Sequence, residues 1–167
     1  TGLRLPTLNE LYRPFVVFPV TTQANAALEN ERLEGFEIGF DWQPVNAVVM
    51  SVTAFDSEVE NAIGNVTIGP NLRRRENLPA ISARGIEASV AARFGSVSLD
   101  GSLAWTDAEV RGEGASLALD GNRPAQTPEF AASLTLGWEP APGWRFASTL
   151  RHVSAQFEDD LEIDSLA

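Results

Sequence analysis

Hydrophobic and polar residues alternate clearly along four segments of the chain. The apolar positions lie two residues apart within residues 36–42, 86–94, 97–105 and 132–138. Because successive side chains of a β-strand point to opposite faces, each segment is predicted to be a strand with one apolar and one polar face. Residues 48–55 and 144–153 alternate less regularly, and a short strand is expected before Pro6. No segment shows a helical period, so the pattern predicts an all-β fold of about seven strands.

The connections between these strands alternate in length. Short connections are expected at residues 43–46, 95–96 and 139–143, and long ones at roughly 9–33, 57–83 and 107–129. In an antiparallel up-and-down meander, alternate connections lie at opposite ends of the sheet. One end is therefore expected to carry tight turns, and the other to carry long loops of the kind found in outer-membrane barrels. Trp42, Trp138 and Trp144 lie beside the short turns, as aromatic residues do at a bilayer edge.

The same pattern fits a soluble β-sandwich that binds a polymer or a partner through its long loops. The two architectures differ in what surrounds the apolar face. In a sandwich, Ile38, Leu99 and Leu136 are buried against a second sheet, whereas in a membrane barrel they face lipid.

Composition narrows the classes of function. The 167 residues include 12 Lys and Arg and 23 Asp and Glu, and the formal charge of −11 argues against a nucleic-acid partner, since binding phosphates requires excess cations. The chain has no cysteine and one histidine, His152, which excludes disulfides, thiol catalysis and multi-histidine metal sites within it. No nucleophile–base arrangement or phosphate-binding glycine pattern is visible. We therefore expect no enzymatic activity, no catalytic residue, no cofactor and no resident metal.

A series of short motifs resembles the TonB-dependent outer-membrane receptors. Residues 4–12 (RLPTLNELY) match the R-x-P-T-x-x-E-L-Y segment of this family, and residues 25–32 (NAALENER) resemble the N-P-x-L-x-P-E that follows it, with both prolines absent. Glu37 and Gly39 match the E-x-G of the returning strand. Asn77 with residues 84–87 (RGIE) resembles the N…R-G-x-E signature. The matches keep their order over essentially the whole chain.

The resemblance implies that residues 1–167 are the C-terminal part of a 22-stranded barrel, not closed within this fragment, with the plug domain and the final strands outside it. It implies a protein of the outer membrane of a Gram-negative bacterium, in contact with lipid and lipopolysaccharide. Such a receptor imports a scarce nutrient, most often a ferric siderophore and otherwise cobalamin or a carbohydrate, with energy supplied by the TonB complex through the plug. An autotransporter or a simple porin, which lacks a plug, remains an alternative.

Candidate binding residues lie in the expected long loops. Arg73, Arg74 and Arg75 carry guanidinium groups suited to an anionic ligand such as a carboxylate-rich metal chelate. Tyr12 and Arg13 are expected in another ligand-facing loop. The alternative is that the arginines pair with nearby acids or lipopolysaccharide phosphates, and that the aromatic residues only pack the loop.

The remaining charged residues are expected to have structural roles. Glu87, Arg93 and Asp100 are expected to face the lumen, where Arg84 and Glu87 are expected to form an ion pair. The acidic run at residues 158–164 is expected to be a solvated loop, because the glycine that a calcium-binding EF-hand loop requires at its turn is missing.

Overall fold

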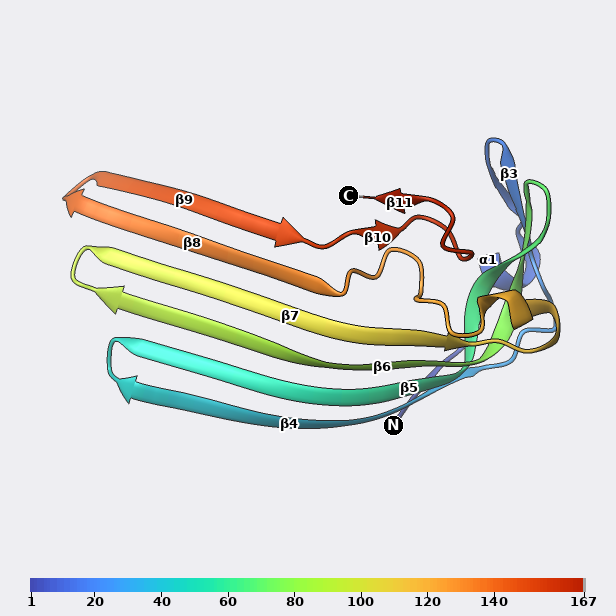
Figure 1. Ribbon diagram of the computed structural model, residues 1–167, viewed down its shortest axis with the longest axis horizontal. Coiled ribbons are helices and arrows are strands. Elements are labelled where there is room, and N and C mark those ends of the chain that lie inside the picture. The colour runs from blue at the N-terminus through green and yellow to red at the C-terminus, as the bar shows by residue number, and fades with distance from the viewer. Residues whose placement is uncertain (167) are drawn as a thin grey trace.

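The computed structural model describes residues 1–166, which form one curved antiparallel sheet with smaller elements at one end (Figure 1). Each of the six strands from β4 to β9 pairs with the next, β1 flanks β4, and the sheet does not close. The strands of this path are β1 (Gly2–Arg4), β4 (Glu31–Val45), β5 (Val48–Gly69), β6 (Leu72–Phe94), β7 (Val97–Arg111), β8 (Phe130–Ala141) and β9 (Trp144–Val153). The predicted all-β meander of about seven strands is confirmed.

Several short elements were not predicted from the sequence. They are α1 (Leu8–Tyr12), β2 (Phe15–Val17), β3 (Val20–Gln23), the 3-10 helix η1 (Gly114–Leu119), β10 (Gln156–Phe157) and β11 (Ser165–Leu166). β2 and β3 form a hairpin, and β3 also runs parallel to the first residues of β6. Figure 1 shows α1 and β3 at the end of the sheet far from the tight turns. In the described part of the chain, no helix is both long and apolar enough to cross a membrane.

The cross-strand register separates an apolar outer face from a polar inner face. On the outer face, Ile86 lies opposite Trp105, which in turn lies opposite Phe130. Ile38 and Leu136 on this face are 64% and 49% exposed, because in residues 1–166 no second sheet packs on them. The soluble sandwich, which requires these side chains to be buried, is therefore excluded.

The apolar face has the height of a bilayer crossing. On β6, β7 and β8 it runs over residues 86–94, 97–105 and 130–138, which is nine residues each and matches the roughly 9–11 residues of a membrane strand. At the tight-turn end, Phe146 lies between Trp138 and Trp144, with ring centroids 5.7 and 6.0 Å away. The predicted aromatic belt at this edge is thus present on the outer face.

The prediction of a long loop at residues 57–83 is wrong. β5 and β6 continue as paired strands beyond the apolar band and meet at a tight turn at Pro70 and Asn71. Asn61, with a φ of 53°, interrupts the alternation of apolar and polar residues. The glycines and prolines of residues 57–83 are typical of loops, so the sequence did not indicate strands there. β7 likewise extends to Arg111, within the loop expected at residues 107–129.

The Arg84–Glu87 motif has a different role from the one predicted. Residues three apart on a strand lie on opposite faces, so the expected ion pair does not form. Arg84 instead donates from Nε and Nη2 to one carboxylate oxygen of Asp107, at 3.1 and 2.8 Å, on the outer face. Gly85 lets β6 pack closely against its neighbours, because a Cβ there would collide with the backbone carbonyl oxygen of Trp105 and would lie 2.7 Å from Cζ of Phe55.

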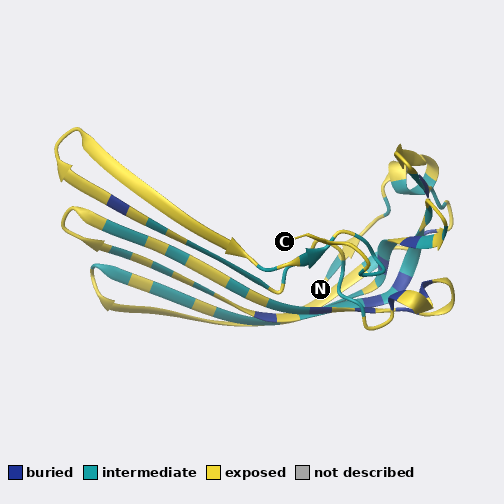
Figure 2. Ribbon diagram, turned by 45° about the horizontal axis from the view of Figure 1, so that its top comes forward, coloured by how far each residue is buried: buried dark blue, intermediate teal, exposed yellow. Residues whose placement is uncertain are grey.

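The buried core lies at the far end of the long strands. It consists of a buried cluster with partly buried neighbours Val59, Ile81 and Leu161; the cluster is Ala62, Val66, Leu78, Val110 and Leu119. Figure 2 shows that most buried residues gather at this end, whereas the strands towards the tight turns are largely exposed or intermediate. The far end is thus a folded lobe of its own, and the rest of the sheet is a wall with two accessible faces.

Candidate functional site

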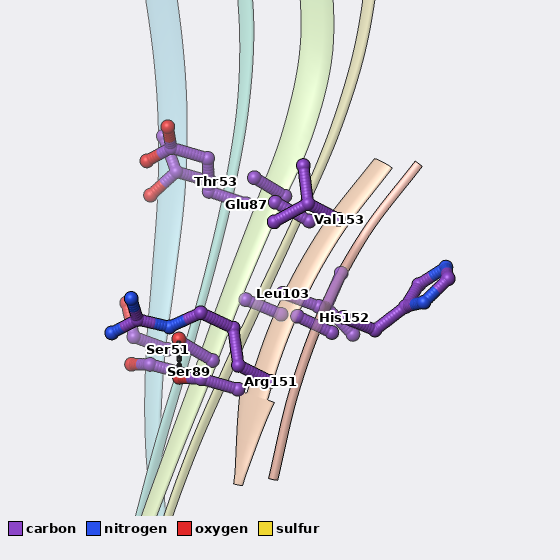
Figure 3. Close-up of a pocket in the computed structure, with 14 residues that line it drawn as sticks. Ser51, Thr53, Glu87, Ser89, Leu103, Arg151, His152 and Val153 are labelled. Atoms are coloured by element: carbon purple, nitrogen blue, oxygen red, sulfur yellow. Dashed lines mark hydrogen bonds between the residues drawn. The ribbon is translucent and has the colours of Figure 1, made fainter. Parts of the chain in front are cut away.

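The inner face of the wall contains a shallow hollow of 560 Å³ that spans β5 to β9. Figure 3 shows Glu87 beside Thr53, while the Arg151 side chain extends towards Ser51 and Ser89. His152 points away on the opposite side of the sheet (Figure 3), near the ring of Phe130 at a centroid distance of 6.0 Å. The predicted lumen position of Glu87 is therefore confirmed.

A row of serines crosses the floor of this hollow at one level of the sheet. The register places Ser51 opposite Ser89, Ser89 opposite Ser102, and Ser102 opposite Ser133, with Arg151 next in the row. The hydroxyl oxygens of Ser102 and Ser133 are 2.9 Å apart. Small hydroxyl groups leave the lumen open while offering donors and acceptors to whatever occupies it.

The hollow shows no arrangement for nucleophilic or metal chemistry. Its serines lie on the inner face and His152 points to the outer face, so this histidine does not reach them as a base. Within residues 1–166, no group of three His, Asp or Glu side chains is close enough to hold a metal ion. The chemistry of the inner wall is that of a polar contact surface.

A second hollow, of 330 Å³, lies in the lobe at the other end of the sheet. Apolar side chains from β6, β7 and η1 form part of its lining, and its charged lining residues are two arginines, Arg73 and Arg123, and two acids, Glu158 and Asp160. Arg73 pairs with Asp160 at 3.5 Å, and Arg123 pairs with Glu129 at 3.5 Å. An apolar hollow with a few charged groups is the usual form of a small-molecule site.

The arginine triplet lies on a strand, not in a loop, and its three members point to different partners. Arg73 lines the second hollow. Arg74 pairs with Glu76, its neighbour two residues along β6. Arg75 contacts backbone carbonyls of the N-terminal segment. Of the three, only Arg73 is among the residues that line this hollow, so the triplet is not a single cationic patch.

Tyr12 and Arg13 lie at the end of α1, away from the second hollow. The Tyr12 side chain is strongly exposed, at 67%, and Arg13 is also exposed. The carbonyl of Arg13 accepts a hydrogen bond from Arg75 at 3.2 Å.

Sequence reasoning did not select Arg123, because it is an isolated arginine in a turn with no motif around it. A role for it becomes visible only when the turn folds back over β7.

Three of the family-like motif residues meet in an ion cluster beside the lobe. Arg4 contacts both Glu31 and Glu10, and Glu31 also accepts the amide of Ile63 at 2.7 Å. The hydrogen bond from Arg4 is the main cause that holds the pKa of Glu31 below its ordinary value of 4.5, against the opposing effect of burial. Burial acts most strongly on Glu10 and raises its pKa, but hydrogen bonds from Thr7 and Arg4 outweigh it and leave the pKa lowered.

The acidic run near the C-terminus is not simply solvated, in contrast to the prediction. Asp160 accepts hydrogen bonds from the amide and the hydroxyl of Thr67, both at 2.9 Å, and Glu162 accepts the amide of Arg123 at 2.7 Å. Asp159 accepts three amides of its own turn. These carboxylates fasten residues 156–164 across the end of the lobe.

An unclosed meander with an apolar outer face, a polar inner face and tight turns at one end defines a wall segment of a transmembrane β-barrel. A family model described as the TonB dependent receptor-like β-barrel matches residues 1–165. The chain therefore belongs to the TonB-dependent receptor family, which resides in the outer membrane of Gram-negative bacteria.

Solved structures agree on the fold. The chain is similar to the copper transporter OprC, with a TM-score of 0.71 and 19% identity over 94% of this chain and 24% of that one. It is also similar to the siderophore receptor PiuA from Acinetobacter baumannii (TM-score 0.67, 18% identity, 81% of this chain and 20% of that one). The unliganded ferric citrate transporter FecA matches at 0.66 and 22% identity, with 80% and 20% covered. No curated protein sequence matches the chain. The chain thus spans only about a fifth to a quarter of these receptors.

Proposed function

We propose that this chain supplies part of the barrel wall and outer loops of a receptor that imports a ferric siderophore or another anionic iron chelate. The plug domain, the final strands and the contact with the TonB complex belong to other parts of that receptor. The proposal draws on the family and on the siderophore and ferric citrate receptors among the similar structures. Transport by such a receptor needs positioned binding groups and no catalytic residue.

The observation that supports an anionic chelate as the ligand is the second hollow, whose partly apolar lining includes Arg73 and Arg123 together with the carboxylates of Glu158 and Asp160. Both guanidiniums pair at 3.5 Å with carboxylates, which an anionic ligand can replace. Guanidinium–carboxylate hydrogen bonds are among the stronger polar contacts in proteins. Arg74, Tyr12 and Arg13 remain proposed contacts, since their side chains are exposed at the same end of the molecule.

Copper is the alternative cargo suggested by the similarity to OprC. The chain itself argues against a copper site here. Soft sulfur and imidazole ligands favour copper, and the 167 residues contain no cysteine, one methionine and one histidine. His152 faces outward beside Phe130. A copper receptor would have to place its ligands elsewhere in the barrel.

The experiment is a binding titration of the full-length receptor in detergent with ferric citrate, with ferric hydroxamate and catecholate siderophores, and with copper ions. We expect one ferric chelate to bind, and Arg73→Ala and Arg123→Ala each to weaken it by about tenfold, the smaller end of the effect of losing a charged hydrogen bond. Arg145→Ala is the control, since Arg145 lies at the tight-turn end and pairs with Glu139 at 3.4 Å. Equal affinity in all variants, or binding of copper alone, would refute the proposal.

We also propose that the apolar band contacts membrane lipid and that the charged residues beyond it contact lipopolysaccharide. Arg84 lies on the outer face just past the band and pairs with Asp107 at 2.8 Å, and Arg111, at the far end of β7, pairs with Glu58 at 3.1 Å. Lipid retained by the purified receptor, measured by native mass spectrometry with and without Arg84→Ala, tests this. Unchanged lipopolysaccharide retention would contradict it.

A further inference from the structure

The side chain of Arg75 on β6 binds the segment that leads into the β2–β3 hairpin. Its Nη1 donates to the carbonyl oxygens of Asn9 and Arg13, the latter at 3.2 Å, and its guanidinium lies 5.1 Å from the ring centroid of Phe15. Asn9 belongs to α1, Arg13 is the residue that ends it, and Phe15 is the first residue of β2. A planar guanidinium can bind carbonyls at its edge and an aromatic ring on its face at the same time.

The segment that leaves the hairpin is held at the same residue. Asn25 follows β3 and donates from Nδ2 to the backbone carbonyl of Arg75 at 2.9 Å and to the carboxylate of Glu76 at 3.2 Å. The backbone amide of Asn25 donates to the backbone carbonyl of Glu10 at 3.0 Å, which joins this foot of the hairpin to α1. Both feet of the hairpin therefore converge on Arg75, one through its side chain and one through its backbone.

The tip of the hairpin lacks comparable support. β2 and β3 share three residue pairs, and only β3 pairs with β6. Val16, Val17 and Phe18 are exposed, Phe18 at 93%. A two-stranded hairpin has little stability of its own, so the direction in which this apolar tip points depends on the pairing of β3 with β6, which includes the bond from the amide of Thr21 to the carbonyl of Asn71, and on how its feet are held.

The partners of Arg75 also distinguish it from its neighbours. Arg73 and Arg74 pair with the carboxylates of Asp160 and Glu76, which an incoming anion can displace. Arg75 is bound to neutral carbonyls and a ring. An anion that captured it would remove the side-chain donor from the carbonyl of Arg13 and one of the two donors from the carbonyl of Asn9, and that loss would offset part of the free energy of the new ion pair.

We propose that Arg75 is a positioning residue that fixes the β2–β3 hairpin at the loop end of the receptor, and that it does not bind the ligand. The part of this proposal that concerns the orientation of the hairpin depends only on the contacts of Arg75 and Asn25 described above. Its relevance to uptake rests on the proposed function, because the hairpin lies at the end of the sheet where the ligand is expected to enter.

The test uses the full-length receptor with a nitroxide spin label at Phe18→Cys, since the chain has no other cysteine, and with any cysteine elsewhere in the receptor removed. We expect Arg75→Ala to increase label mobility at least several-fold, and the matched control Arg74→Ala to leave it unchanged. Arg75→Lys should restore part of the immobilisation, because an ammonium can donate to the same carbonyls. Thermal unfolding of the barrel should be equal in all of these variants.

Equal label mobility in Arg75→Ala and Arg74→Ala would overturn the proposal. If Arg75→Ala prevents folding, Arg75→Met replaces it, because it keeps the length of the side chain and removes its hydrogen-bond donors; an immobile label in that variant would likewise overturn the proposal. Titration of the same labelled receptors with ferric citrate and the siderophores separates the two ideas. A hairpin mobilised by Arg75→Ala in a receptor that binds no ferric chelate supports the positioning role and refutes the proposed function.

Discussion

A charge placed at Leu134 on the outer face of β8 is expected to destabilise the receptor strongly. Leu134 lies midway between Phe130 and Trp138, and this stretch covers about 27 Å along the strand at about 3.4 Å per residue. With a strand tilt of about 40°, Leu134 lies roughly 10 Å from each edge of the apolar band, measured along the membrane normal. Arginine at the midplane of a membrane barrel costs about 2–4 kcal/mol. Leu134→Arg should therefore reduce the folding equilibrium constant by roughly 30-fold to 700-fold.

The assay is reversible urea unfolding of the full-length receptor in lipid vesicles. Thr135→Arg is the matched control, since Thr135 is the next residue of β8, faces inward and lies opposite Asp100. Trp138→Arg, at the edge of the band, should cost only about 0–1 kcal/mol for the charge itself, in addition to the lost aromatic contact with Phe146. If Thr135→Arg destabilises the barrel as much as Leu134→Arg, the assignment of the two faces is wrong.

Three further outcomes follow from contacts in and near the lobe. Gly85→Ala should destabilise the barrel by about 1–3 kcal/mol in the same urea assay, because its methyl group would collide with the backbone carbonyl of Trp105 and the ring of Phe55, whereas Gly69→Ala, which meets no atom within 4 Å, should be close to neutral. Asn77→Ala removes two hydrogen bonds to Glu29 and one to Asn61, so hydrogen exchange at the Glu29 amide should accelerate about fivefold or more; an unchanged rate would contradict this. The pKa of Glu31 is lowered, so its stabilising contact is present above pH 4.5 and is lost as the pH falls through the lowered pKa. Hydrogen exchange at the Ile63 amide, corrected for the pH dependence of the intrinsic exchange rate, should therefore change with pH only below about pH 4.5. Glu31→Gln should abolish that change.

The membrane part of the fold could be predicted from the sequence, because one rule governs it. Lipid on one side and a polar lumen on the other impose a period of two, and residues 86–94 and 97–105 follow it except for small residues, Ala91 and Ala104 on the inner face and Gly101 on the outer face. Outside the membrane this constraint disappears. Strands β5 and β6 continue there with mixed side chains, and Asn61 breaks the period, so the pattern resembled a loop.

The candidate site was less predictable for a related reason. Its members come from segments far apart in the chain, and the partners of each charge decide its role. The run of three arginines indicated one cationic patch, but the twisted strand directs Arg73 to Asp160 and Arg75 to the carbonyls of α1. Arg123 carried no signal, because an isolated arginine acquires a role only from the fold around it.

The long extension of β5 and β6 affects how such a barrel is inserted. Membrane barrels carry their longer connections on the external side, so the charged ends of these strands must pass through the hydrocarbon before the apolar band can settle. Asp56, Glu58 and Arg84 lie on the outward side of that hairpin. Since ionised side chains cross hydrocarbon at a high free-energy cost, spontaneous insertion should slow steeply as the bilayer thickens, and assembly in the cell should depend on a machine that thins or opens the membrane for this hairpin.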